Sequence, residues 1–285
     1  MKIHERAMLT RINIKMCSFR KLDKKVTDDV ILKHCAGVDA GRFNKLLIPK
    51  EYIAPVQKAE SALRSVFYEE TLPYDDSGYR VLPTENFLPF TQKINKRTED
   101  FNDAADTLAT GYQDAREEGR RMLNGMFKES DYPNTAEEVR NKFSAKVDFR
   151  DLPKGGNFMV DLGDEHVDSI REEIEARTNE GLAEAQKDIW RRLLEVTSHF
   201  ASVMGDGGKV FRNSTVDNVL KICELAPRMN LSGDPELDEL ASQILSDVSN
   251  QSPDSLRKSK WHRGQVAERA KEHVRKIESA MEGAL

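Results

Sequence analysis

The chain has 285 residues, of which 33% are charged, 38% are hydrophobic and 7% are aromatic, and its formal net charge is -5. The mean hydropathy of -0.63 suits long, partly solvated helices better than a thick α/β core. The sequence has no apolar run near the length of about 18 residues that a membrane span requires, and residues 1–11 lack the apolar region of a signal peptide. We therefore expect a soluble protein that has no membrane association and stays in the cytoplasm.

Cysteines and charges add two further constraints. Cys17, Cys35 and Cys223 are odd in number and widely spaced, which argues against a disulfide framework.

The charges are distributed unevenly. Residues 1–25 carry eight Lys/Arg against two acids, and residues 254–276 carry eight against three, which leaves a net charge of -16 for the rest of the chain. The basic ends could dock on the acidic body or on a neighbouring copy, or they could contact a polyanion.

The first predicted domain, residues 1–83, is a short β/α segment followed by a helix. Polar and apolar residues alternate over residues 9–20, which is typical of a half-buried strand. Thr27 could cap a short helix, and a better amphipathic helix covers residues 53–70. An elbow rich in proline, aspartate and glycine at residues 72–83 then joins it to the next domain.

The second predicted domain, residues 84–205, is organised around a heptad seam. Apolar residues recur at every seventh position from residue 87 and predict one helix over residues 87–127. Because such a helix cannot bury its apolar face alone, we expect it to form a long antiparallel hairpin with a second helix at residues 164–204. The candidate interface residues of this seam are Phe87, Ile94, Phe101, Leu108, Tyr112, Met122, Ile189, Leu193 and Phe200. The pattern leaves open whether the helices pair within one chain or between chains.

A β-hairpin is predicted between these two helices, at about residues 146–162. Residues 146–151 and 157–162 alternate in polarity, and the turn Pro153-Lys-Gly-Gly156 separates them. The hairpin would cap the tip of the helical hairpin.

The third predicted domain, residues 206–285, is a C-terminal helical bundle. Its helices cover residues 214–229, residues 234–249 and a stretch from residue 252 or 254 to residue 281. The predicted fold class is therefore mainly α, elongated and coiled-coil-like.

Two acidic clusters are candidates for a cation site or for acid/base chemistry. Asp75 and Asp76 lie in the elbow, and Asp161, Asp164, Glu165 and His166 lie at the start of the second long helix. The favoured reading of both is structural, because carboxylates also satisfy turn backbones and helix N-termini. The sequence contains no His-Glu-x-x-His, Cys-x-x-Cys, phosphate-loop or G-x-S-x-G motif. We therefore assign no catalytic, cofactor-binding or metal-binding residue, and we expect no enzyme.

A basic segment near the C-terminus is a candidate nucleic-acid contact. It interleaves cations with one aromatic residue: Arg257, Lys258, Lys260, Trp261 and Arg263. Cations at these positions could meet phosphates while the indole stacks on a base. The alternative is that Trp261 is a packing anchor.

Several segments together resemble a bacteriophage and prophage protein family of unknown function. The segments are FRKLDK at residues 19–24, DAGRFNKLLIP at 39–49, the elbow at 72–83, VDLGD at 160–164 and NLSGDPEL at 230–237. The resemblance covers nearly the whole chain in the same order. It implies a phage protein in the host cytoplasm, and an AAA ATPase as one protein partner, but it implies no catalytic residue.

These observations favour a non-enzymatic protein that acts by self-assembly, as a homo-oligomer, or as an adaptor that docks on a protein partner. The alternative is a nucleic-acid-binding accessory protein that uses the basic C-terminal segment. An enzyme that uses Asp75 and Asp76 is the third and least supported hypothesis.

Overall fold

A computed structural model describes most of the chain: residues 5–157, 164–206, 212–251 and 253–283. The protein is mainly helical, with a small antiparallel sheet. The mainly α part of the predicted fold class is thereby confirmed.

The chain divides into two compact units. Unit 1 comprises Met1–Arg11, Tyr68–Phe90 and Phe149–Leu285, and unit 2 comprises Ile12–Phe67 and Thr91–Asp148. Both units combine stretches that are distant in the sequence, and they therefore differ from the three consecutive domains that we predicted.

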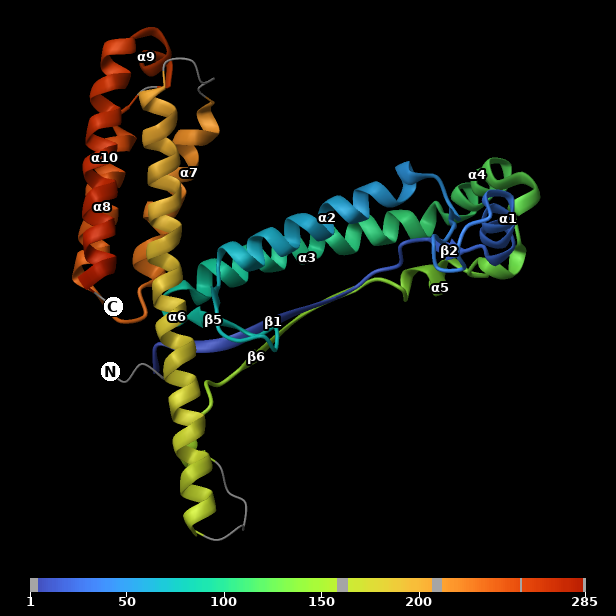
Figure 1. Cartoon of the computed structure of the whole chain (residues 1–285), viewed down its shortest axis with the longest axis horizontal. Helices are drawn as coiled ribbons and strands as arrows, with labels where there is room; N and C mark the ends of the chain where they lie inside the picture. The colour runs from blue at the N-terminus through green and yellow to red at the C-terminus, as the bar shows by residue number, and fades with distance from the viewer. Residues whose placement is uncertain (1–4, 158–163, 207–211, 252, 284–285) are drawn as a thin grey trace. The chain divides into compact units, whose positions relative to one another are not determined.

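Unit 1 contains a four-helix bundle (Figure 1). In the bundle α6 packs against α7 and α10, and α8 also packs against α7 and α10. Successive helices run in opposite directions, which is the up-down-up-down arrangement. The helices are α6 (Asp164–Gly205), α7 (Asn213–Leu225), α8 (Pro235–Ser249) and α10 (Lys260–Gly283), with the short α9 (Pro253–Lys258) before α10. The three predicted C-terminal helical stretches are thus confirmed, the last one interrupted at Ser259.

Local signals explain where the bundle helices lie. From its middle onward α6 buries Leu182, Ile189, Leu193 and Phe200, which recur at spacings of seven, four and seven residues and so share one helix face. The α8 helix begins at Asp234, whose carboxylate accepts a hydrogen bond of 3.0 Å from the backbone nitrogen of Glu236.

The sheet has the strand order β4-β5-β1-β6. Strand β1 pairs antiparallel with β5, so that Leu9 lies opposite Val81. The strands are β1 (Ala7–Lys15), β4 (Leu72–Pro73), β5 (Arg80–Pro83) and β6 (Ser144–Arg150). The predicted N-terminal strand is therefore present, but it ends at Lys15.

The described residues contain the first strand of the β-hairpin predicted at residues 146–162. This strand is β6, and the neighbour of β6 in the sheet is β1. Gly155–Asn157 forms a 3-10 turn, η5, and residues 158–162 lie outside the described residues. The alternation in sequence identified a strand without specifying its partner.

Unit 2 contains the long helices of the heptad region. Helix α3 (Phe87–Thr110) is followed by α4 (Tyr112–Leu123), and the helical path ends with the 3-10 turn η3 (Asn124–Met126). The single helix predicted over residues 87–127 is therefore interrupted at Gly111, where ψ is 8° and the backbone leaves the α-helical region. Helix α2 (Lys50–Glu69) adds Ile53, Val56 and Leu63 to the buried residues of this unit.

The predicted long hairpin between residues 87–127 and residues 164–204 is not confirmed. The second helix is present as α6, but its main helical neighbours are α10 and α7 in unit 1. Helix α3 beyond Phe90 belongs to unit 2 together with most of α2. The heptad pattern specified a face that must be buried, but it did not specify which helix covers that face.

Most of the seam residues are buried within the chain. Of the nine candidate interface residues, seven are buried: Ile94, Phe101, Leu108, Tyr112, Ile189, Leu193 and Phe200. Phe87 is half-buried and Met122 is 46% exposed. The seam therefore offers no continuous surplus face for a partner, and we withdraw it as the docking surface.

Residues 20–46 of unit 2 form a two-stranded sheet and one helix. Strands β2 (Arg20–Leu22) and β3 (Asn44–Leu46) pair antiparallel, and α1 (Lys24–His34) lies between them in sequence. Other short helical elements of the chain are α5 (Ala136–Arg140), η2 (Thr84–Asn86), η4 (Glu129–Asp131) and η6 (Ala226–Met229).

A close approach at Gly119 tests the packing of unit 2. A Cβ atom at this position would lie 2.1 Å from the carbonyl oxygen of Leu47, which also accepts a hydrogen bond from the Tyr132 hydroxyl. Because backbone must move to relieve that clash, we expect Gly119→Ala to lower the free energy of unfolding by about 2 kcal/mol in urea titrations. Gly125→Ala is the control, since its Cβ would meet no atom within 4 Å. Equal stability of the two variants would contradict this packing.

Candidate interaction surface

Helix α1 begins at a carboxylate cap. The Asp23 side chain accepts a hydrogen bond of 3.3 Å from the backbone nitrogen of Val26. Thr27, the residue that we predicted as the cap, lies inside the helix instead. Its hydroxyl donates to the Asp23 carbonyl oxygen over 2.8 Å and accepts from the Phe43 nitrogen over 3.0 Å. The helix ends at Cys35, whose φ of 47° lies in the left-handed region.

No residue of α1 is buried, although the helix contains Val26, Val30, Ile31 and Leu32. In the described part of the chain, ten large hydrophobic side chains are exposed, and five of them fall between residues 22 and 43. We call these five residues the α1 surface: Leu22, Val30, Leu32, Val38 and Phe43. Val30 and Leu32 are two positions apart and therefore lie on different sides of α1, so the exposed apolar side chains are spread around this segment. Exposed apolar side chains gathered in one segment are a candidate interaction site.

A hollow of about 320 Å³ lies on one side of α1, and Val30 and Phe43 of the α1 surface line it. One wall is a single face of α1, formed by Thr27, Val30, Ile31 and His34, whose positions repeat with the helical period. Phe43 also lines the hollow. The volume is at the lower end of the range for ligand pockets, and it suits one apolar anchor from a partner.

A buried lysine fixes this region within unit 2. Lys45 is only 3% exposed, and its Nζ lies 3.3 Å from Asp23 Oδ2 and 2.7 Å from Asp131 Oδ2. It also donates to the carbonyl oxygen of Met126 over 2.7 Å. Lys45 thus joins strand β3 to the α1 cap and to η4.

The Lys45 cluster shifts the pKa values of its members. The hydrogen bond from the Val26 backbone, with help from Lys45, lowers the pKa of Asp23. Burial alone would raise the pKa of Asp131, but hydrogen bonds from Lys21 and Lys45 outweigh it and lower that pKa. Burial likewise opposes the charge of Lys45, yet its two carboxylate partners raise its pKa. All three groups are therefore stabilised in their charged forms.

The acidic residues of the elbow serve the turn. Asp75 Oδ1 accepts hydrogen bonds from the backbone nitrogen of Ser77, over 3.0 Å, and from its hydroxyl. An open groove of about 620 Å³ lies between the elbow and the middle of α6. It is lined by acidic residues, Asp75 and Asp76, and by basic residues, Arg177 and Lys187. The geometry supports the structural interpretation of Asp75 over a catalytic one.

The second acidic cluster is only partly described. Asp161 lies outside the described residues, and His166 is exposed near the start of α6. Among the described side chains, no group of three His, Cys, Asp or Glu residues could hold a metal ion.

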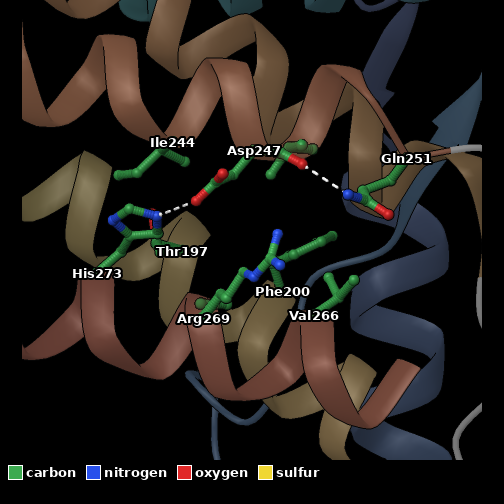
Figure 2. Close-up of a pocket in the computed structure, with 10 residues that line it drawn as sticks. Thr197, Phe200, Ile244, Asp247, Gln251, Val266, Arg269 and His273 are labelled. Atoms are coloured by element: carbon green, nitrogen blue, oxygen red, sulfur yellow. Dashed lines mark hydrogen bonds and ion pairs between the residues drawn. The ribbon is translucent and has the colours of Figure 1, made fainter. Parts of the chain in front are cut away.

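A small pocket lies inside the bundle where α6, α8 and α10 meet (Figure 2). His273 Nε2 lies 2.8 Å from Asp247 Oδ2, and Gln251 donates to the Asp247 carbonyl oxygen over 3.0 Å. The free space is about 10 Å³, which is the size of one water molecule. Thr197 Oγ1 and His273 Nδ1, which belong to residues that line the pocket, are buried without a hydrogen-bond partner in the described structure. This pocket is a packing feature and is too small for a substrate.

Only part of the basic C-terminal segment, residues 257–263, is available to contact an external partner. Arg263 donates to the carbonyl oxygens of Val203, over 2.8 Å, and Asp206, over 3.0 Å, and so caps the end of α6. Arg257 donates to Asn213, and Lys258 is the last residue of α9. Lys260 is exposed and Trp261 is 73% exposed. The interpretation of Trp261 as a packing anchor is therefore wrong.

Sequence reasoning missed the α1 surface. The only available signal was the run Val-Ile-Leu at residues 30–32 inside an otherwise polar helix. A sequence pattern shows that side chains are apolar, but it cannot show that nothing in the fold covers them.

The fold and the surface thus define a mainly α-helical protein with a bundle unit and a second unit that carries a helix with exposed apolar side chains. No match was found among protein-family models, curated proteins or solved structures. Within the described residues, no helix has the length and apolar character needed to cross a membrane.

Removing the buried lysine should destabilise unit 2. We expect Lys45→Ala to lower the free energy of unfolding by about 3 kcal/mol, because it leaves two buried carboxylates without their shared cation. The matched control is Lys21→Ala, which removes the 49% exposed partner of Asp131 and should cost less than about 1 kcal/mol. Urea titrations of both variants measure the difference, and a loss of similar size in both would contradict the role of Lys45.

The same cluster predicts a pH dependence. Because the folded pKa values of Asp23 and Asp131 lie below their ordinary value of 3.8, their stabilising effect is complete above that value and is lost as the pH falls. The pKa of Lys45 is raised above its ordinary value of 10.5, so the stabilisation of the folded state by Lys45 is lost only as the pH rises above 10.5. We therefore expect Asp131→Asn to be less stable than the wild type at about pH 7 and the gap to close below about pH 3. A gap that is constant with pH would refute this linkage.

Proposed function

We propose that this chain is a non-enzymatic protein that self-assembles through its α1 surface. The observation that carries the proposal is that α1 buries none of its apolar residues, while Val30 is 49% and Leu32 is 76% exposed. Covering these side chains would gain about 25 cal/mol for each Å² of apolar surface removed from water. That gain is available only from a partner.

Charge complementarity favours a second copy of the chain as that partner. Residues 20–45 carry seven Lys/Arg and four Asp, a net charge of +3, which leaves -8 for the rest of the chain. On α6, residues 166–184 carry six acids against two cations, and all six acidic side chains are exposed. The exposed cations around α1, which include Lys24, Lys33 and Arg42, complement that helix surface.

An interface between α1 of one copy and α6 of the next is heterologous, since it joins two different surfaces. Heterologous contacts form a ring where the rotation closes and an open chain where it does not. The assembly should therefore grow with protein concentration, and salt should weaken it by screening the charged rim.

The family resemblance supports a second version of this function. In that version the α1 surface makes the protein an adaptor for a different protein, such as an AAA ATPase. A bacteriophage origin and a location in the host cytoplasm have the same support from the resemblance alone.

Light scattering after size-exclusion chromatography tests the self-assembly. We expect the mass of the wild-type protein to rise with concentration at low salt and the double variant Val30→Asp/Leu32→Asp to stay monomeric. Both positions are exposed, so the substitutions should leave the fold intact. Leu88→Asp is the matched control, because Leu88 is 69% exposed and lies outside the α1 surface.

A charge exchange identifies the surface of the second copy. Lys24→Glu/Lys33→Glu should abolish assembly, and adding Glu172→Lys/Glu173→Lys to the same chain should restore it. A wild type that is monomeric at every concentration would refute self-assembly. Assembly that survives Val30→Asp/Leu32→Asp would show that α1 is not the interface.

A further inference from the structure

An exposed tryptophan marks a different surface, at one end of the unit 1 bundle. Trp261 lies in the first turn of α10 and is 73% exposed, and Lys260 beside it is exposed as well. One turn further along, Gly264 presents no side chain, and a Cβ atom there would meet open space.

Further cations lie near this tryptophan. Arg257 is exposed in α9, and its guanidinium donates to the Asn213 side chain at the start of α7. That contact brings the neighbouring residue of Asn213, the exposed Arg212, to the same end of the bundle. We call Arg212, Arg257, Lys260 and Trp261 the bundle-end surface. Figure 1 shows that α9 and the first turn of α10 lie at the end of the bundle where α6 terminates.

Acidic residues also lie near this surface, among them Asp254 in α9. Glu268, two turns along α10 from Trp261, lies 2.7 Å from Lys271 Nζ, and that contact lowers its pKa. Asp206 brings one carboxylate to the same end of the bundle, where its carbonyl oxygen accepts from Arg263. The burial of Leu256 holds α9 against the bundle, so the cations sit on an anchored helix.

We infer that the bundle-end surface binds single-stranded nucleic acid. Trp261 stacks on a base, and Lys260, Arg257 and Arg212 contact the phosphates on either side. An isolated aromatic side chain among cations suits base stacking, which requires only one flat face. Docking on a protein or a lipid surface would require a broader apolar patch, such as the one around α1. This function is independent of the proposed self-assembly, because it uses other residues in the other unit.

The two tryptophans of the chain allow a direct test. Trp190 is 3% exposed in the bundle core, so it reports on folding, whereas Trp261 reports on the surface. We expect a dT20 oligonucleotide at low salt to quench the fluorescence of Trp261 and to leave that of Trp190 in the Trp261→Phe variant unchanged. Heparin, which has no bases, should bind without this quenching.

Anisotropy titrations with fluorescein-labelled dT20 measure the contribution of each group. Trp261→Ala should weaken binding about tenfold, since stacking on one base is lost. Lys260→Gln should weaken binding and should reduce the dependence of affinity on salt by roughly one phosphate contact. Arg275→Gln is the matched control, because Arg275 is an exposed cation further along α10.

Three results would overturn the inference: no binding of dT20 at low salt, equal affinity of Trp261→Ala and the wild type, or an equal loss in Arg275→Gln and Lys260→Gln. The last two would show binding through general positive charge only. Val30→Asp/Leu32→Asp should bind dT20 with the affinity of the wild type even if the protein does not self-assemble, so each proposal can fail without the other.

Discussion

The arrangement of unit 2 around α1 depends on the burial of one lysine. Removing the Lys45 ammonium from water is costly, and the structure offsets that cost with two carboxylates and one carbonyl oxygen. Asp23 has two tasks here, since it also caps α1. The same residue therefore couples the start of the helix to the buried charge. As a result α1 is held from its N-terminal end, and the exposure of its apolar side chains is not a sign of loose attachment.

Because its apolar side chains are exposed, α1 lacks the stabilisation that most helices gain from packing. An isolated helix of 11 residues is marginal in water, and in folded proteins most of the stability of a helix comes from burying an apolar face. Helix α1 buries none of its residues and relies on its cap and on the hydrogen bond between Thr27 and Phe43. A partner that covers Val30 and Phe43 would supply the missing packing. Assembly and the local stability of α1 are then two aspects of one contact.

Sequence patterns predicted the elements of this fold better than their neighbours. The positions of α6, α7 and α8 follow from local periodicity and from caps such as Asp234, which act within a few residues. The helices against which α6 packs do not follow from these local signals, because any helix with a complementary apolar face satisfies the same pattern. The candidate sites divide in the same way. The basic character of residues 257–263 is visible in the sequence, but the capping role of Arg263 and the exposure of Trp261 arise from tertiary structure.

The two candidate surfaces are both cationic parts of an acidic chain, and their apolar content separates them. Electrostatic attraction is long-ranged and speeds the encounter with any anionic partner, so charge alone would make them interchangeable. The hollow beside α1 is lined by Val30, Ile31 and Phe43 together with Arg42, and salt does not screen the burial of an apolar group there. At the bundle end the cations surround one flat indole, which limits apolar contact to a single stacked ring. High salt should therefore leave the first surface with a residual affinity for an apolar anchor, whereas the second would keep little without its phosphates. The two proposed surfaces therefore differ in chemistry, so the proposed protein docking and the proposed nucleic-acid binding would not compete.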